Sequence, residues 1–170
     1  DDIGGCPVGC LGIPEFGTDF VIQMVVDTKP NTISDLIRIS GLSHGTDVWL
    51  NNAQELIRSG KATISTAICT RDDIMTYLIN KGMDSEESFT KCKEWPEFKK
   101  DIAEHNVPDW YVWSCEQIKY MFPKAHAAAY VMMAYRIAYC KINYPLAYYG
   151  AYFGIRADAF SYEIMCQGKE

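Results

Sequence analysis

Apolar residues recur at every third or fourth position through most of the chain, which is the spacing of amphipathic helices. Strict alternation of apolar and polar residues is weak, and only residues 62–68 show it. The pattern therefore predicts a mainly α fold in which the helix 124–143 is the longest and runs through the middle. The expected helices cover residues 18–29, 32–39, 46–60, 70–82, 108–121, 124–143 and a shorter aromatic helix around 148–153.

Local signals set the expected ends of these helices. Several segments start at a residue whose side chain can cap a helix, namely Thr18, Thr32 or Ser34, Thr46 and Thr70. Pro108 suits the first position of its helix because a proline lacks the N–H that would be unbonded there. The turn 41–45 contains two glycines, and we expect it to end the helix that precedes it.

The first residues of the chain have a different composition. Residues 1–16 are rich in glycine and proline, which predicts a connecting strap with few regular backbone hydrogen bonds. Residues 17–170 would then form the helical region. The chain begins at Asp1 and not at methionine, from which we expect a segment of a longer protein.

Composition narrows the class of protein. Hydrophobic residues make up 48% of the chain and charged residues 22%, as in ordinary globular domains. The sequence has no apolar run of the roughly 18 residues that a membrane span requires, so we expect a soluble, cytoplasmic protein. The net charge is −6, yet residues 117–157 have no acidic residue and hold five basic ones, Lys119, Lys124, Arg136, Lys141 and Arg156. This stretch is either a surface for phosphate groups or an ordinary solvated helix face.

Candidate catalytic and metal-binding residues are sparse. The seven cysteines are scattered, and only Cys6 and Cys10 are close enough for a zinc site, with no second pair or nearby histidine. Asp72 and Asp73 are neighbours, but adjacent helical residues point about 100° apart, so helix capping explains them better than metal binding. We therefore assign no catalytic residue and no metal ligand to this chain.

The segment 123–130 offers the strongest binding chemistry. His126 and Tyr130 share a helix face at a spacing of four residues, and three consecutive alanines lie between them. A nucleotide suits this surface: Tyr130 offers a stacking plane, while Lys124 and His126 can reach phosphate oxygens near the helix N-terminus. The alternative is that the alanines mark close helix packing and that the histidine is structural.

The same segment resembles a known family. Residues 122–130, with Tyr135-Arg136-Ile137-Ala138-Tyr139 and Asn143-Tyr144-Pro145, resemble the Lys-x-His-Ala-Ala-Ala-Tyr…Tyr-Pro signature of the bacterial C-family replicative DNA polymerases. The blocks 11–18, 39–49 and 70–75 resemble the PolC branch of the DNA polymerase III α subunits. The similarity runs in the same order over nearly the whole chain.

The resemblance implies a function for the region. It is similar to the fingers, an irregular multi-helix domain that binds incoming dNTP and template–primer DNA, so Lys124, His126 and Tyr130 would face the nucleotide. Ser43 and His44 match a turn near the base-pair pocket, and Arg71 is a weaker candidate for a phosphate contact. The family's catalytic aspartates hold Mg²⁺ in a palm domain, and no residue of this chain matches them.

The resemblance also implies partners, and one departure from the family stands out. The implied partners are DNA, dNTP, the palm and thumb of the same polymerase, and a sliding clamp bound by the whole protein. The fragment alone should be inactive. The family usually has a longer, basic, glycine-containing insertion between the helix near Phe89 and Val107. At that place this chain has only residues 90–96, so the insertion is absent, shortened or divergent. A second interpretation is a helical nucleic-acid or protein interaction module without polymerase activity.

Overall fold

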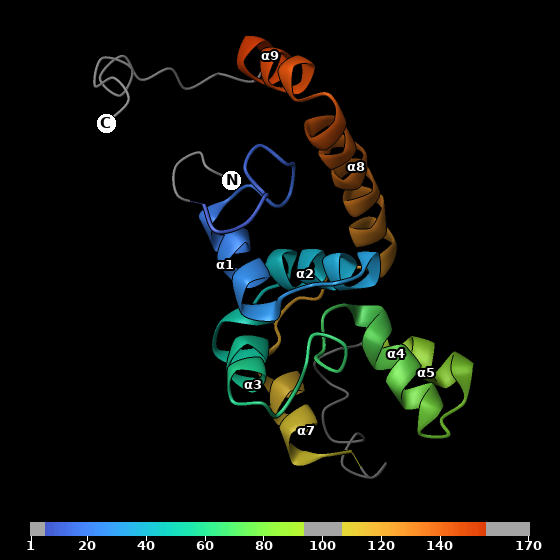
Figure 1. Cartoon of the computed structure of the whole chain (residues 1–170). Coiled ribbons are helices and arrows are strands. Elements are labelled where there is room, and N and C mark those ends of the chain that lie inside the picture. Colours follow the sequence, from blue (N-terminus) through green and yellow to red (C-terminus); the bar gives the residue numbers. More distant parts are fainter. Residues whose placement is uncertain (1–5, 94–106, 156–170) are drawn as a thin grey trace. The chain divides into compact units, whose positions relative to one another are not determined.

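A computed structural model describes residues 6–93 and 107–155, and those residues form helices joined by short connections (Figure 1). The chain divides into two compact units, residues 1–134 and 135–170. None of the described residues forms a strand, and they make one isolated bridge, between Thr46 and Tyr120. The mainly α prediction is therefore confirmed. None of the described helices is both long enough and apolar enough to cross a membrane.

The first two helices begin where the sequence predicts. Helix α1 (Asp19–Thr28) starts after Thr18, whose hydroxyl accepts a hydrogen bond from the Val21 N–H, and it ends before Pro30. Helix α2 (Ile33–His44) starts with a capping box between Thr32 and Asp35. In such a box each residue's side chain satisfies a backbone N–H of the other, which fixes the helix start.

The predicted end of α2 is wrong. We expected residues 41–45 to break the helix, but it continues through Gly41 to His44. A Cβ atom on Gly41 would lie 2.6 Å from the Cys69 carbonyl oxygen and 2.6 Å from the Thr70 methyl group. Gly41 is therefore a point of close contact between α2 and the segment before α4, and not a helix breaker.

The predicted helix start at Thr46 is also wrong. The Thr46 N–H donates to the Tyr120 carbonyl at 2.9 Å, and the Thr46 carbonyl accepts from the Lys119 N–H at 3.1 Å. This pairing holds Thr46 in an extended bridge instead of a helix cap. An irregular turn, η1 (Trp49–Ala53), follows with Asn51 at φ 56°, and α3 (Gln54–Arg58) begins only after it.

The remaining helices of the first unit follow the pattern with adjusted ends, except that the helix over 85–93 was not among those expected. They are α4 (Arg71–Asn80), α5 (Ser85–Lys93), α7 (Asp109–Gln117) and the start of α8 (Lys124–Asn143). Helices α4 and α5 lie side by side (Figure 1). Pro108 precedes α7 by one residue, and α7 stops early because Lys119 and Tyr120 pair with Thr46. Residues 94–106, where the family's insertion would lie, are outside those that the structure describes.

Residues 62–68 contain a turn held by a Thr63–Thr66 hydrogen bond. They form no strand, although their sequence alternates weakly between apolar and polar residues.

The core of the first unit collects aliphatic side chains from most of its helices. The most buried large residues are Met24, Ile39, Leu42, Val48, Ile68, Ile74, Leu78, Ile118 and Val131. The described part of the predicted strap, residues 6–16, makes two turn hydrogen bonds, from the Ile13 N–H to the Cys10 carbonyl and from the Phe16 N–H to the Ile13 carbonyl. That residues 1–16 form a connecting strap stays a prediction, and residues 1–5 lie outside the described part.

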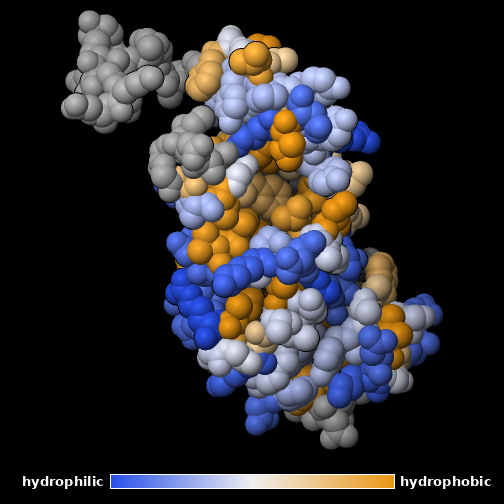
Figure 2. Space-filling model, viewed as in Figure 1, coloured by the Kyte–Doolittle hydropathy of each residue, from blue (hydrophilic) through white to orange (hydrophobic). Residues whose placement is uncertain are grey.

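The second unit contains the end of α8 and helix α9 (Pro145–Ile155). Its tyrosines contact each other, as in the Tyr148–Tyr152 stack at 6.1 Å. Tyr135, Tyr139 and Ile142 of α8 are exposed. That this helix runs through the middle of the fold stays a prediction for its second half. Hydrophobic residues also reach the surface over α9 (Figure 2).

Candidate functional site

Two helix N-termini meet at the start of α8. The Lys124 N–H donates to the Asp72 carboxylate at 2.8 Å, and the Arg71 N–H donates to the Phe122 carbonyl oxygen at 3.4 Å. Asp72 therefore caps α8 from the first turn of α4. Helix N-termini bear partial positive charge, so the junction of α4 and α8 favours anions.

Four rings gather beside this junction. His44, the last residue of α2, stacks on Phe122 with ring centres 4.9 Å apart and lies parallel to Tyr130 at 6.3 Å. Phe122 and Tyr130 are 6.4 Å apart, and His126 meets Phe122 edge-on at 6.0 Å. We call His44, Phe122, His126 and Tyr130 the aromatic face. Offset and edge-on pairs at these distances attract each other beyond their simple burial.

Hydrogen bonds hold the His44 ring in place. Its Nδ1 atom lies 2.8 Å from the Ser40 carbonyl oxygen and 2.9 Å from the Ser43 hydroxyl. Its Nε2 atom lies 2.7 Å from the Glu15 carboxylate. Glu15 has a φ of 71°, which is unusual for a residue with a side chain and typical of a turn held by its surroundings. The strap therefore supplies a carboxylate that fixes His44 from the opposite side of its ring.

The aromatic face is accessible. His44 and His126 are exposed, and Tyr130 keeps 42% of its surface exposed. The sequence left open whether the alanines 127–129 allow a ligand to approach or pack against another helix, and the structure shows both kinds of position. Ala127 is fully buried and packs α8 onto the unit, whereas Ala129 is exposed. The face therefore combines a helix that is fixed underneath with rings that a planar ligand can approach.

The structure brings most of the predicted binding residues together. Ser43, His44, His126 and Tyr130 meet as expected, and Arg71 adjoins Phe122 through its backbone. The Lys124 side chain instead lines a cavity of about 350 Å³, and no residue of the aromatic face lines that cavity. Sequence reasoning missed Phe122 as a ring partner, although it opens the signature segment. It also missed Glu15, because no sequence spacing links the strap to α2.

The basic residues of the stretch have different surroundings. Lys119 pairs with Asp47 at 2.7 Å, and this pair raises the pKa of Lys119 through a hydrogen bond and an attractive charge. Lys141 is largely buried, and Arg156 lies outside the described residues. Lys124 is thus the member of the stretch that stands at the helix junction.

The acidic pair is occupied by capping. Asp73 accepts hydrogen bonds from the N–H groups of Cys69 and Thr70 at 3.1 and 2.9 Å, while Asp72 caps α8. The two carboxylates therefore cap different helices, which confirms the capping that the sequence predicted for this pair. Within residues 6–93 and 107–155, no three histidine, cysteine or acidic side chains gather as metal ligands.

Comparisons with known proteins cover most of the chain. The family model of the bacterial DNA polymerase III alpha subunit finger domain matches residues 7–107. PolC-type DNA polymerases III are similar over nearly the full chain: that of Caldanaerobacter subterraneus is 57% identical over 98% of the chain, and that of Bacillus subtilis is 56% identical over 96%. The chain spans 12% of the length of each of these relatives. The chain therefore belongs to the family of bacterial DNA polymerase III alpha subunit finger domains.

Proposed function

We propose that this chain is the fingers region of a replicative DNA-directed DNA polymerase and that its aromatic face binds the incoming dNTP opposite the template. The observation that carries the proposal is the parallel stack of His44 and Tyr130 beside the N-termini of α4 and α8. Stacked rings accept a base or sugar, and helix N-termini accept phosphate groups. The PolC-type relatives are polymerases by name, which supports this assignment.

Each residue has a role in this proposal. Tyr130 and His44 provide planes against the base and sugar, and the Ser43 hydroxyl helps to hold His44. His126, Lys124 and Arg71 lie around the junction of the two helices and can donate hydrogen bonds to phosphate oxygens. Glu15 is a positioning residue, because it acts through His44.

The chemical step itself belongs to the parent polymerase. The 3′-oxygen of the primer attacks the α-phosphorus of the dNTP, a new P–O bond forms, and pyrophosphate leaves. Mg²⁺ bound by palm carboxylates would activate that oxygen and neutralise the phosphate charge. Asp72 and Asp73 do not fit such a site because both are engaged in capping. This chain contributes orientation, which lowers the barrier by prealigning the reacting groups.

The parent protein would act in the cytoplasm with template–primer DNA, its own palm and thumb, and a sliding clamp. The isolated 170-residue chain should extend no primer when Mg²⁺, dNTP and template–primer are supplied, because it lacks a paired set of carboxylates among its described residues. A primer-extension assay checks this expectation. Extension by the purified chain would contradict the proposal that the chemical step depends on the palm domain.

The assignment of the aromatic face is tested in the parent polymerase. Tyr130→Ala and His126→Ala should each raise KM for dNTP by about tenfold, because a stacking plane or a phosphate donor is lost. Tyr135→Ala is the matched control, since Tyr135 is an exposed tyrosine of the same helix outside the face. Unchanged kinetics for Tyr130→Ala and His126→Ala would remove this face from the mechanism, and loss of folding together with activity would assign both residues to packing.

A further inference from the structure

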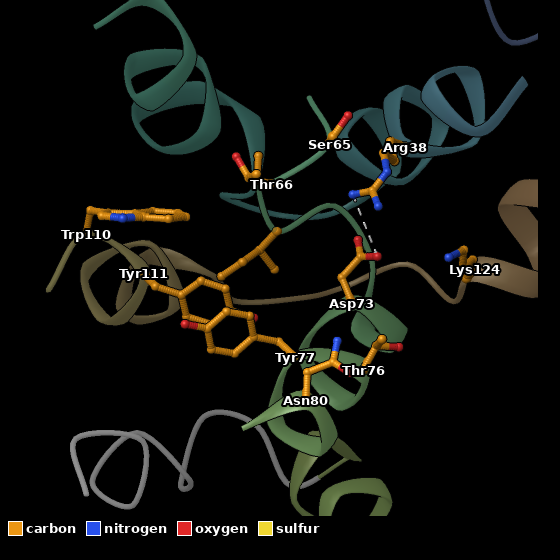
Figure 3. Close-up of a pocket in the computed structure, with 12 residues that line it drawn as sticks. Arg38, Ser65, Thr66, Asp73, Thr76, Tyr77, Asn80, Trp110, Tyr111 and Lys124 are labelled. Carbon is orange, nitrogen blue, oxygen red and sulfur yellow. Dashed lines mark ion pairs between the residues drawn. The ribbon is translucent and has the colours of Figure 1, made fainter. Parts of the chain in front are cut away.

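A cavity of about 350 Å³ lies beside the junction of α4 and α8, apart from the aromatic face. Residues of α2, the turn 65–68, α4, α7 and the first residue of α8 line it (Figure 3). Its volume is at the lower end of the range of roughly 300–1,000 Å³ that is typical of small-molecule sites. It can therefore take a base or a mononucleotide but not a duplex.

One side of the cavity is aromatic. Tyr77 and Tyr111 stack with ring centres 4.1 Å apart, and Trp110 meets Tyr111 edge-on at 5.6 Å (Figure 3). Trp110 is partly exposed, so its ring is accessible from solvent. Such rings offer stacking planes to any planar group that enters.

The hydroxyl of Tyr111, one of the residues that line the cavity, is buried and has no hydrogen-bond partner among the described residues. The Tyr111 side chain is only 2% exposed. Burial raises the pKa of Tyr111, so the phenol keeps its proton and stays a hydrogen-bond donor. Buried polar groups in native structures are nearly always paired, and an unpaired one calls for an explanation.

The opposite side of the cavity is polar. Arg38 pairs with Asp73 at 3.9 Å and donates to the Ile64 carbonyl at 3.4 Å, so this cation is fixed in direction. Asn80 and Lys124 are exposed where they line the cavity, and no carboxylate of a described residue pairs with Lys124. The polar side can thus read a base edge through Asn80 and contact a phosphate through Lys124.

We propose that this cavity, the base cleft, binds a single unstacked nucleobase, with Trp110 and the Tyr77–Tyr111 pair as its stacking side. The base would come either from a free nucleotide or from a single-stranded segment of nucleic acid. The inference extends the proposed function, since a polymerase meets single-stranded template, but it concerns a site distinct from the aromatic face.

The test compares strands with and without bases. A fluorescein-labelled oligothymidylate and an abasic strand of equal length and charge are titrated with the 170-residue chain, and anisotropy gives the two dissociation constants. The base-bearing strand should bind about tenfold more tightly, because phosphate contacts are equal and only stacking differs. Equal affinities, or no binding of either strand, would overturn the proposal.

Variants locate the effect. Trp110→Ala should remove most of the difference between the two strands, whereas Trp113→Ala should preserve it, because Trp113 belongs to the same helix, is also partly exposed and does not line the cavity. Circular dichroism of both variants reports whether the helices remain. Loss of the difference in Trp113→Ala but not in Trp110→Ala would contradict the base cleft.

Two further measurements distinguish a free nucleotide from a single strand, and the base cleft from the aromatic face. Displacement of the oligothymidylate by thymidine monophosphate would assign the cleft to free nucleotides, and its failure to displace would assign the cleft to strands. Tyr130→Ala should reduce the difference less than Trp110→Ala does, because the aromatic face also offers a stacking plane. If Tyr130→Ala removed the affinity difference between the two strands while Trp110→Ala did not, the base would bind at the aromatic face. That result would contradict the base cleft and would leave the proposed function intact.

Discussion

The aromatic face and the base cleft flank one helix junction but are built in opposite ways. In the aromatic face, both nitrogens of the His44 ring have partners while the rings stay exposed. In the base cleft, Tyr111 is buried and its hydroxyl has no partner among the described residues. The first surface has its ring nitrogens paired before a ligand arrives, and we propose that the second takes up a base between its aromatic and polar sides.

This difference bears on how each surface could work. Exposed rings that are already oriented let a ligand enter and leave without rearrangement, which suits a nucleotide that is consumed at each step. A cavity encloses more of a bound base than an exposed face does, so release from it breaks more contacts. We therefore expect fast exchange at the aromatic face and slower release from the base cleft.

The largest effect should come from Gly41, which supports both surfaces. Gly41→Ala places a Cβ 2.6 Å from the Cys69 carbonyl oxygen, so α2 must move away from the segment before α4. Such overpacking lowers the free energy of unfolding by about 1–3 kcal/mol. Because α2 supplies both His44 and Arg38, dNTP use in the parent polymerase and strand binding by the chain should weaken together.

Urea unfolding of the 170-residue chain measures this effect. Gly150→Ala is the control, since a Cβ there meets open space within α9 and should leave stability unchanged or raise it by up to about 1 kcal/mol. A Gly41→Ala variant as stable as the unmodified chain would mean that the two surfaces do not share this contact.

A smaller effect should separate the two surfaces. Glu15→Gln removes the negative charge opposite His44 Nε2. Partly exposed ion pairs contribute little, so KM for dNTP in the parent polymerase should rise by about two- to fivefold. Strand binding at the base cleft should not change, because Glu15 does not line it. Glu55→Gln changes an exposed carboxylate of α3 and is the control. Equal changes in KM for dNTP in the two variants would contradict a positioning role for Glu15.

The smallest effect lies outside both surfaces. Burial raises the pKa of Asp27, but hydrogen bonds from Gln23, Gln54 and Arg58 outweigh it and hold that pKa below the ordinary value of 3.8. A lowered carboxyl pKa stabilises the fold above the unfolded value, and this contribution is lost as the pH falls through the folded value.

Asp27→Asn should therefore lower the free energy of unfolding at neutral pH by less than about 1 kcal/mol, because solvent screens the pair. The difference between variant and unmodified chain should begin to shrink as the pH falls below 3.8 and should vanish once the pH is below the lowered pKa of the folded chain. Unfolding measured across this pH range checks the expectation, and a difference that persists at low pH would refute the carboxylate's role. Both binding surfaces should remain intact.

Sequence reasoning succeeded where the cause is local. Thr18 and Thr32 cap helices through residues three positions away, and Asp73 accepts the N–H of Thr70 over the same distance. These signals need no knowledge of the rest of the chain. The placement of His126 and Tyr130 on one accessible helix face is equally local and was also correct.

Sequence reasoning failed where the cause is distant. Gly41 looks like a helix breaker until Cys69 is seen against it, and Thr46 looks like a cap until Tyr120 pairs with it. The sequence assigns Glu15 no special role, and only the structure shows its carboxylate beside His44 Nε2. Each case depends on a partner far along the chain, and neither composition nor periodicity reports such partners.

The most direct test of the central claim is a double-mutant cycle on the stacked pair of the aromatic face. Single-turnover incorporation by the parent polymerase gives the Kd for dNTP with His44→Ala, with Tyr130→Ala and with both changes. Each single change should raise Kd by about tenfold, and the double change by clearly less than the product, because the two rings act on one ligand as a unit. An unchanged Kd in all three variants would contradict the claim that this face holds the incoming nucleotide.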